Sequence, residues 1–312
     1  MPRRIIIDTD PGADDAVALL LALGAPEALE IEGIVAVAGN LPLDLTARNA
    51  RAVLELAGRA QVPVHAGAAQ PLQRPLATAR VQEARGLATL FLPEPAGGLQ
   101  QKSGIDFLAE ALSGGGEEGL TLCALGPLTD IALALDRAPA IAGRVRELVL
   151  MGGAGFELGN VTPAAEFNIW VDPHAAAKVL ASGMKITIVP LDATHRVLST
   201  AARLARLDRL GNRCGPYAAR LIRTFDEPRV RRYGRRGRAL HDPCVIAYLL
   251  APELFRGREV NVMVETQSPL ALGMTVVDWW GVTGRPANAR FLDRVDAGGV
   301  YDLLAEKLAR LP

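Results

Sequence analysis

Short apolar runs rich in β-branched residues alternate along this chain with longer segments that have a helical apolar period. The first run, residues 5–7, is followed by a helix-forming segment over residues 13–23, and this order recurs along the sequence. Strands are predicted at residues 5–7, 31–37, 62–65, 120–124, 147–151, 185–190, 259–265 and 270–278. Helices are predicted at residues 13–23, 46–58, 103–112, 128–135, 172–182, 200–225 with a break at 211–215, 240–251 and 297–310.

Strands that alternate with helices predict an α/β fold with an open, mostly parallel, Rossmann-like central sheet flanked by helices. We predict a single domain over residues 1–312, because no repeat or clear linker divides the chain and α/β domains often reach this length. Residues 68–102 carry several Pro, Gly and Gln without a clear period. They are predicted to be mostly loop, with room for a helix over residues 78–90.

Sheets of this kind bind ligands beyond the carboxyl ends of their strands. The segments that follow the predicted strands are Asp8 to Asp15, Asn40, Leu125-Gly126, Met151-Gly152 and Asp192. We therefore expect polar groups from separate parts of the chain to converge on one crevice at this edge.

Four carboxylates, Asp8, Asp10, Asp14 and Asp15, surround a Pro-Gly turn between the first strand and the first helix. Side chains alternate along a strand, so Asp8 and Asp10 share a face. Carboxylates this close repel one another, and a hard cation with oxygen ligands would offset the repulsion. Ca²⁺ or Mg²⁺ suits such ligands better than Zn²⁺. For Asp14 alone, the alternative is a helix N-cap.

Two further segments concentrate polar groups. Asn160, Glu166 and Asn168 lie in a stretch without core periodicity, which is also typical of a surface turn. His241 and Asp242 precede an apolar helix, where an aspartate is also expected as a plain N-cap.

Composition narrows the classes of function. Lys and Arg total 34, as do Asp and Glu, so no net charge favours nucleic acid or an anionic membrane. The three cysteines are widely spaced, which argues against a disulfide scaffold or a zinc site. The first residues lead directly into the first predicted strand, and no apolar run is long enough for a bilayer. We expect a cytoplasmic protein without nucleic-acid or membrane partners.

The motifs together resemble the inosine–uridine-preferring nucleoside hydrolases. They are DTDPGADDAVALLLAL at residues 8–23, AGN at 38–40, ALGPLTD at 124–130, NVTPAAEFNIWVDPHAA at 160–176 and HDP at 241–243. The segments occur in the family's order and cover nearly the whole chain. The run DTDPGxDD, combined with a distant HDP, is the specific part of the resemblance.

This resemblance implies Ca²⁺-dependent hydrolysis of the N-glycosidic bond of a ribonucleoside, which gives ribose and a free base. It implies carboxylate ligands at Asp10, Asp15 and Asp242 and a carbonyl ligand at Leu125, with Asp10 also the general base. Asp8 would orient these ligands from behind. The residues implied to bind the ribose and the water are Asp14 and Asn168 at the 2′- and 3′-hydroxyls, Asn160 and Glu166 at the 5′-hydroxyl, Met151 in the sugar pocket and Asn40 beside the water and the sugar.

The chemistry itself calls for such residues. Breaking a ribosyl C–N bond builds positive charge on the sugar, which carboxylates stabilise. The leaving base needs a proton, and His241, beside Asp242, is a suitable donor. The other histidines, His65, His174 and His195, are predicted to be structural.

The chain also departs from the family pattern. Gln82 stands where many relatives carry a histidine that faces the base; it can hydrogen-bond a base but cannot transfer a proton. Asp130 stands where Asn is more usual, which we interpret as a detail of the helix. Tyr233 lies among the arginines of residues 229–238, in a segment that resembles the part closing over the base, and it is predicted to contact the base.

Two alternatives stay open from the sequence. One is a Mg²⁺-dependent phosphatase with a DxD motif, although the Gly-Thr expected after that motif is missing. The other is a nucleoside-binding protein without turnover, which the changed region at Gln82 makes plausible. The resemblance also predicts a homo-oligomer, either a dimer or a tetramer.

Overall fold

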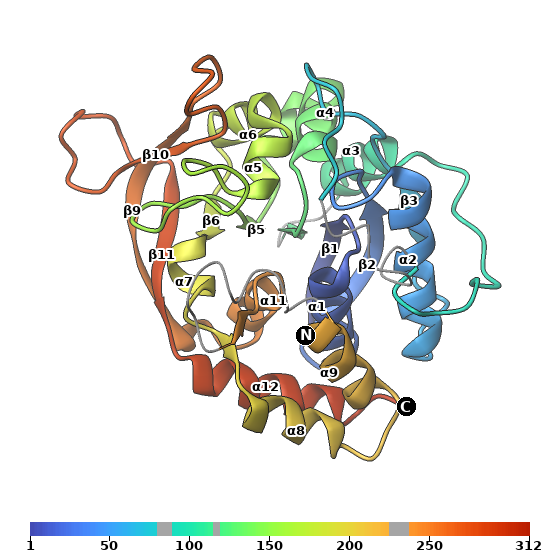
Figure 1. Ribbon diagram of the computed structural model, residues 1–312. Coiled ribbons are helices and arrows are strands. Elements are labelled where there is room, and N and C mark those ends of the chain that lie inside the picture. The colour runs from blue at the N-terminus through green and yellow to red at the C-terminus, as the bar shows by residue number, and fades with distance from the viewer. Residues whose placement is uncertain (80–88, 115–118, 225–236) are drawn as a thin grey trace.

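The computed structural model describes residues 1–79, 89–114, 119–224 and 237–312, in which a large central sheet carries helices on both faces (Figure 1). The strands of this sheet are β1 (Arg3–Thr9), β2 (Leu29–Ala36), β3 (Val64–Ala66), β4 (Thr121–Ala124), β5 (Glu147–Met151), β6 (Ile186–Val189), β9 (Phe255–Val264), β10 (Thr275–Asp278) and β11 (Ala289–Val295). They lie side by side in the order β10-β9-β11-β6-β5-β4-β1-β2-β3. A separate ribbon pairs β7 (Leu198–Ser199) with β8 (Arg238–Ala239).

All neighbouring strands from β3 across to β11 run parallel, and β9 and β10 complete the sheet in antiparallel pairing. The prediction of an α/β fold with an open, mostly parallel sheet is therefore confirmed. Because the strands run parallel, the ends of β1, β2, β4, β5 and β6 point to one edge, where the polar segments were expected.

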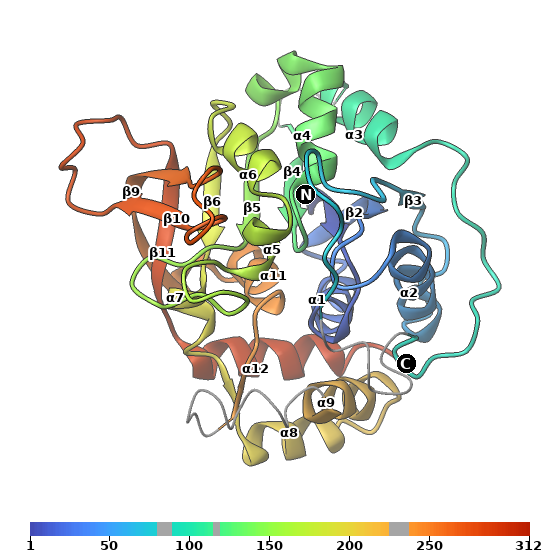
Figure 2. The ribbon, with the colours of Figure 1, turned by 45° about the horizontal axis from the view of Figure 1, so that its top comes forward.

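The helices connect the strands and cover the sheet (Figures 1 and 2). They are α1 (Ala13–Leu23), α2 (Leu43–Leu56), α3 (Gly104–Ser113), α4 (Thr129–Arg137), α5 (Phe167–Val171), α6 (Pro173–Leu180), α7 (Leu191–Thr194), α8 (Ala201–Asp208), α9 (Cys214–Thr224), α11 (Pro243–Leu250) and α12 (Ala297–Leu308), with 3₁₀ turns at Pro139–Gly143 and Pro252–Leu254.

Both faces of the sheet are buried, which explains why its strands are continuous apolar runs. In β1, Ile5 and Ile7 belong to the core on the side of α1, α11 and α12, whereas Ile6 belongs to the core beneath α3, α4 and α6. No helix in the described residues is long and apolar enough to cross a membrane.

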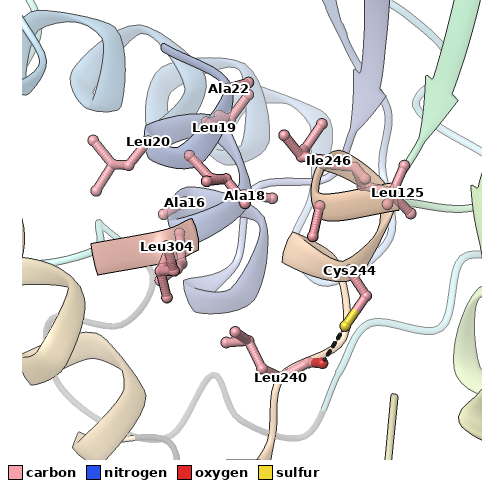
Figure 3. Close-up of a cluster of buried hydrophobic side chains, with 14 of the residues drawn as sticks. Ala16, Ala18, Leu19, Leu20, Ala22, Leu125, Leu240, Cys244, Ile246 and Leu304 are labelled. Carbon is pink, nitrogen blue, oxygen red and sulfur yellow. Dashed lines mark hydrogen bonds between the residues drawn. The ribbon is translucent and has the colours of Figure 1, made fainter. Parts of the chain in front are cut away.

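Helix α1 lies at the centre of the first of these cores. All its residues except Asp14 are buried, as expected for a helix that is apolar on every side. Figure 3 draws Ala18 of α1 together with Ile246 of α11 and Leu304 of α12, all members of one buried cluster. This packing fixes the N-terminus of α1 against the N-terminus of α11, although the two helices are far apart in sequence.

The structure corrects several predicted boundaries. Thr46 does not cap α2, which begins at Leu43; its hydroxyl donates instead to the Leu43 carbonyl oxygen at 3.0 Å. Strand β11 was not predicted. Its charged residues interrupt the apolar run, and its register against β9 shifts between Leu292 and Arg294. Most of the helix expected over residues 78–90 lies outside the described residues, and the described ends of that range are not helical.

Candidate active site

The turn between β1 and α1 is closed by Asp15. Its Oδ1 accepts a hydrogen bond from the Thr9 hydroxyl at 2.7 Å, and its Oδ2 accepts one from the Gly12 N–H at 3.1 Å. Gly12 occupies the N-cap position of α1. The carboxylate of Asp15 therefore holds the end of the strand and the start of the helix together.

Asp10 is completely buried inside this turn. Its Oδ2 accepts a hydrogen bond from the Asn40 N–H at 2.6 Å, whereas its Oδ1 has no hydrogen-bond partner among the described residues. Two glycines make room for it: a Cβ on Gly39 would lie 2.1 Å from Oδ2, and one on Gly126 would lie 2.7 Å from Oδ1. The fold thus admits a buried carboxylate and leaves one of its oxygens available to a ligand.

Asp14 connects the turn to α11. Its Oδ2 accepts hydrogen bonds from the N–H groups of His241 at 2.7 Å and Asp242 at 3.2 Å. It therefore does not act as an N-cap of α1. Asp242 occupies the N-cap position of α11, but in the described structure its side chain accepts no capping hydrogen bond. The N-cap alternative for Asp242 is therefore wrong.

The opposite wall comes from the segment between β5 and α5. Asn168 donates from Nδ2 to the carbonyl oxygens of Leu125 at 2.7 Å and Met151 at 3.1 Å. Glu166 accepts from the N–H groups of Gly153 at 3.1 Å and Asn168 at 3.0 Å and so caps α5. These bonds tie the ends of β4 and β5 to α5.

Most of the predicted site residues line one pocket at this edge. They are Asp14, Asp15, Asn40, Leu125, Met151, Asn160, Glu166, Asn168, His241 and Asp242, and Ala13, Ala79, Phe167 and Arg238 complete the lining. Asp10 does not line this pocket but bonds to Asn40, which does. The predicted base contacts Gln82 and Tyr233 lie outside the described residues, as do the arginines of residues 229–236.

The pocket carries unfavourable buried charge. Burial, and then the charge of Asp15, raise the pKa of Asp10 well above its usual range. Burial, and then the charges of Asp15, Asp14 and Asp10, do the same to the pKa of Asp242. Burial raises the pKa of Asp14 to about 6, against the opposing effect of Arg238. For Asp10 and Asp242, burial and neighbouring acids together disfavour the charged form, whereas Asp14 has Arg238 as a partial counter-charge.

The donor set suits a hard cation. Asp10, Asp15 and Asp242 carry carboxylate oxygens and Leu125 a carbonyl oxygen, the kinds of atom that Ca²⁺ and Mg²⁺ take as ligands in proteins. In the described part of the chain, however, no group of three or more His, Cys, Asp or Glu side chains is arranged to hold a metal ion. A cation would have to draw these carboxylates together.

Asp8 and Asp130 form a second buried acidic pair behind the turn. Neither Asp8 oxygen has a hydrogen-bond partner among the described residues. Burial and the facing Asp130 raise the pKa of Asp8 well above its usual range. Burial raises the pKa of Asp130 to about 7, and its Oδ1 accepts from the Ala68 N–H at 2.6 Å. Asp130 is thus a buried acid that faces Asp8 of β1.

Sequence reasoning did not identify His195 as a neighbour of His241. His195, predicted to be structural, has its ring centroid 5.7 Å from that of His241. Its position directly after α7, which follows β6 at the same edge, was the available signal. The other two histidines lie elsewhere: the ring of His65 stacks on Phe107, and His174 lies in α6.

Comparison with known proteins agrees with this geometry. The sequence model described as inosine-uridine preferring nucleoside hydrolase matches residues 5–302. An uncharacterized protein of Schizosaccharomyces pombe is 47% identical over 310 residues, which are 99% of this chain and 100% of that protein. The pyrimidine-specific ribonucleoside hydrolase RihA of Salmonella schwarzengrund is 44% identical over 310 residues, 99% of each chain. A purine-preferring ribonucleoside hydrolase from Gardnerella vaginalis superposes with a TM-score of 0.90 at 27% identity, covering 98% of each chain.

Proposed function

The chain belongs to the inosine-uridine preferring nucleoside hydrolase family and is a ribonucleoside hydrolase, and from this premise we propose that it uses Asp10 and a bound Ca²⁺ ion to activate water against the N-glycosidic bond. The observation that carries this proposal is the buried Asp10 carboxylate, which has one oxygen without a protein partner and lies beside two further acids. No structural role within the described residues uses that oxygen.

Asp10, Asp15, Asp242 and the carbonyl oxygen of Leu125 would hold the ion. Ca²⁺ is preferred to Mg²⁺ because it accepts more oxygen ligands in a less regular arrangement. A bound cation would lower the pKa of a water molecule next to the sugar and place it for attack. Asp10 would accept the proton of that water, because its Oδ1 accepts no hydrogen bond from a donor in the described residues.

The proposed hydrolysis is a single displacement at C1′ of the ribose. The water oxygen bonds to C1′ of the ribose and loses one proton to Asp10. The C1′–N bond breaks, its electron pair leaves with the base nitrogen, and that nitrogen gains a proton. His241 lines the pocket and is the proposed donor of this second proton. The products are ribose and a free base.

The remaining polar residues of the pocket would hold the sugar. Asp14 and Asn168 are proposed at the 2′- and 3′-hydroxyls, and Asn160 and Glu166 at the 5′-hydroxyl. Met151 would pack against the ribose, and Asn40, which bonds to Asp10 through its N–H, would orient the water. Gln82 and Tyr233 stay proposed base contacts.

We further propose pyrimidine ribonucleosides as the preferred substrates. The relative named as pyrimidine-specific is 44% identical to this chain, whereas the structure named as purine-preferring is 27% identical. A homo-oligomeric state and a cytoplasmic location stay predictions.

The test is ribose release from uridine, cytidine, inosine and adenosine, each with Ca²⁺ and with a chelator. We expect Ca²⁺-dependent release that is fastest with a pyrimidine and is lost in Asp10→Ala. Nucleoside binding without ribose release would instead identify a binding protein, and phosphate release from a phosphomonoester would identify the phosphatase alternative.

A further inference from the structure

The ring of His241 is held by residues of α7 and the residue that follows it. The Nδ1 atom of His241 lies 2.8 Å from the hydroxyl oxygen of Thr194, the last residue of α7. Thr194 is fully buried, so this hydroxyl is fixed in place. Because Nδ1 is engaged by Thr194, proton transfer to a substrate is assigned to Nε2 of the same ring.

His195 supports the same ring from its side. The two imidazole rings are inclined by 62° with centroids 5.7 Å apart, in an edge-to-face arrangement. His195 is held in turn by Glu157, because its Nδ1 lies 2.9 Å from Oε2 of that residue. The side chain of His195 is 10% exposed and that of Glu157 is 33% exposed. A carboxylate partner of this kind fixes the orientation of a histidine ring.

Asp192 fixes the position of Glu157. Its carboxylate accepts hydrogen bonds from the backbone N–H groups of Gly155 at 2.7 Å, Phe156 at 2.6 Å and Glu157 at 3.2 Å. The segment after β5 is thereby fastened to the first turn of α7. Asp192, expected from the sequence at the ligand edge, thus bonds to the segment that carries Glu157.

The segment that carries His241 is fastened to the other end of α7. The Leu240 N–H donates to the Val197 carbonyl oxygen at 2.9 Å, and the β7–β8 ribbon pairs the flanking residues. Helices α7 and α11 lie next to each other in both views (Figures 1 and 2). One short helix therefore sets the relative positions of Glu157, His195 and His241.

We propose that Thr194, His195 and Glu157 are positioning residues that orient His241 so that its Nε2 proton meets the departing base. This inference rests on the proposed function, because it assigns His241 the protonation of the leaving group. The proton passes from Nε2 to the base nitrogen as that nitrogen takes the electron pair of the C1′–N bond. Gln82 cannot supply this proton, so the orientation of one histidine becomes decisive.

The experiment compares two substrates that differ in their leaving group. The first is the ribonucleoside that the wild type hydrolyses fastest, whose base needs a proton. The second is p-nitrophenyl β-D-ribofuranoside, whose p-nitrophenolate leaves as an anion. Thr194→Val and Glu157→Gln should lower kcat on the ribonucleoside about 10–100-fold, with little change in KM. On the aryl riboside both variants should keep the wild-type kcat.

Matched controls separate orientation from general damage. Thr194→Ser retains the hydroxyl and should restore ribonucleoside hydrolysis. Thr266→Val and Glu253→Gln make the same chemical changes outside this array and should leave both substrates unaffected. Because Glu157 is partly exposed, Glu157→Gln is expected to fold even if Thr194→Val does not.

Three outcomes would overturn the inference. An equal loss of kcat on both substrates would mean that these residues only support the fold of the site. Unchanged ribonucleoside hydrolysis in Glu157→Gln and Thr194→Val would mean that they do not act on His241. A wild type inactive on both substrates would refute the proposed function itself, a result distinct from a failure confined to the variants.

Discussion

Two groups of buried aspartates at the same edge of the sheet have opposite surroundings. Asp172 and Asp192 are at most 4% exposed, yet their carboxylates are surrounded by donors. Asp10 and Asp242 are at most 6% exposed, and their carboxylates face other acids. Residue type and burial are the same in the two groups. The difference lies only in what surrounds each carboxylate.

Asp172 and Asp192, which we call the satisfied group, accept hydrogen bonds that connect separate segments of the fold. Asp172 accepts hydrogen bonds from the Leu72 N–H and the Thr129 hydroxyl, both at 2.8 Å, and from the Ala175 N–H at 3.0 Å. It thereby caps α6 and joins two distant segments to it. Asp192 accepts three backbone N–H groups in the same manner. Buried carboxylates with this many donors stabilise a fold.

Asp10 and Asp242, which we call the unsatisfied group, are not surrounded by hydrogen-bond donors in this way. One oxygen of Asp10 has no partner among the described residues, and mutual repulsion adds to the burial that raises the pKa values of Asp10 and Asp242. A protein keeps unpaired buried charge only where another requirement maintains it. The surroundings therefore separate aspartates that stabilise the fold from the two aspartates that we propose to bind a cation.

The largest expected effect is on activity. Asp10→Asn keeps an oxygen that can accept from the Asn40 N–H but removes the charge and the proton acceptor. Ribose release should fall by about 10²–10⁴-fold, without a lower Tm in chelator, because a repelled charge is removed. Steady-state kinetics and thermal unfolding check both parts. A large fall in Tm would place Asp10 with the structural aspartates.

Addition of Ca²⁺ should stabilise the wild type but not a variant of the unsatisfied group. A ligand at 100 times its dissociation constant raises the free energy of unfolding by about 2.7 kcal/mol. We expect this rise in urea denaturation of the wild type and its loss in Asp242→Asn. An equal gain in both proteins would show that the ion binds elsewhere.

Much of the fold could be predicted from the sequence because its strands are buried on both faces. Continuous apolar runs such as Ile5 to Ile7 need no long-range information to be identified as strands. Strand β11 could not be predicted in this way, because Arg290, Asp293 and Arg294 interrupt its apolar pattern. Its pairing with β6 and β9 is decided by tertiary contacts.

The site could be predicted as a location more readily than as a set of contacts. The parallel topology placed Asp10, Asn40 and Leu125 at one edge of the sheet. The sequence could not distinguish satisfied from unsatisfied acids, because the donors come from remote segments: Asp172 bonds to Leu72, and Asp14 bonds to His241. For the same reason Thr194 was not identified as a neighbour of His241, nor Glu157 as a neighbour of His195.

Asp172→Asn applies to the satisfied group the same chemical change as Asp10→Asn, with the opposite result expected. The new amide would direct a donor at the N–H of Leu72 or of Ala175, so at least one hydrogen bond is lost. We expect a loss of about 1–3 kcal/mol in the free energy of unfolding, with kcat per folded molecule retained. Urea denaturation and active-site titration measure the two quantities. Unchanged stability would remove the distinction between the groups.

The effect that is smallest over one pH unit concerns Asp130, which combines features of both groups: it accepts from the Ala68 N–H but faces the acid Asp8. Burial raises its pKa to about 7, so between about pH 4 and pH 7 the folded state retains a proton that the unfolded state has lost. The free energy of unfolding in chelator should therefore fall as the pH rises through this window. Asp130 alone contributes at most about 1.4 kcal/mol per pH unit to this fall.

Asp130→Asn should make this pH dependence less steep but not remove it, because the amide does not titrate, whereas Asp8, Asp10 and Asp242 still do. The amide can still accept from the Ala68 N–H. The exposed Asp44→Asn, on the first turn of α2, is the matched control and should leave the slope as in the wild type. The measurement is the free energy of unfolding of the three proteins in chelator at intervals from pH 4 to pH 8. If Asp130→Asn keeps the wild-type slope, Asp130 does not retain a proton in this window and the prediction fails. A less steep slope would mean that burial keeps this acid protonated even though one of its oxygens has a good donor.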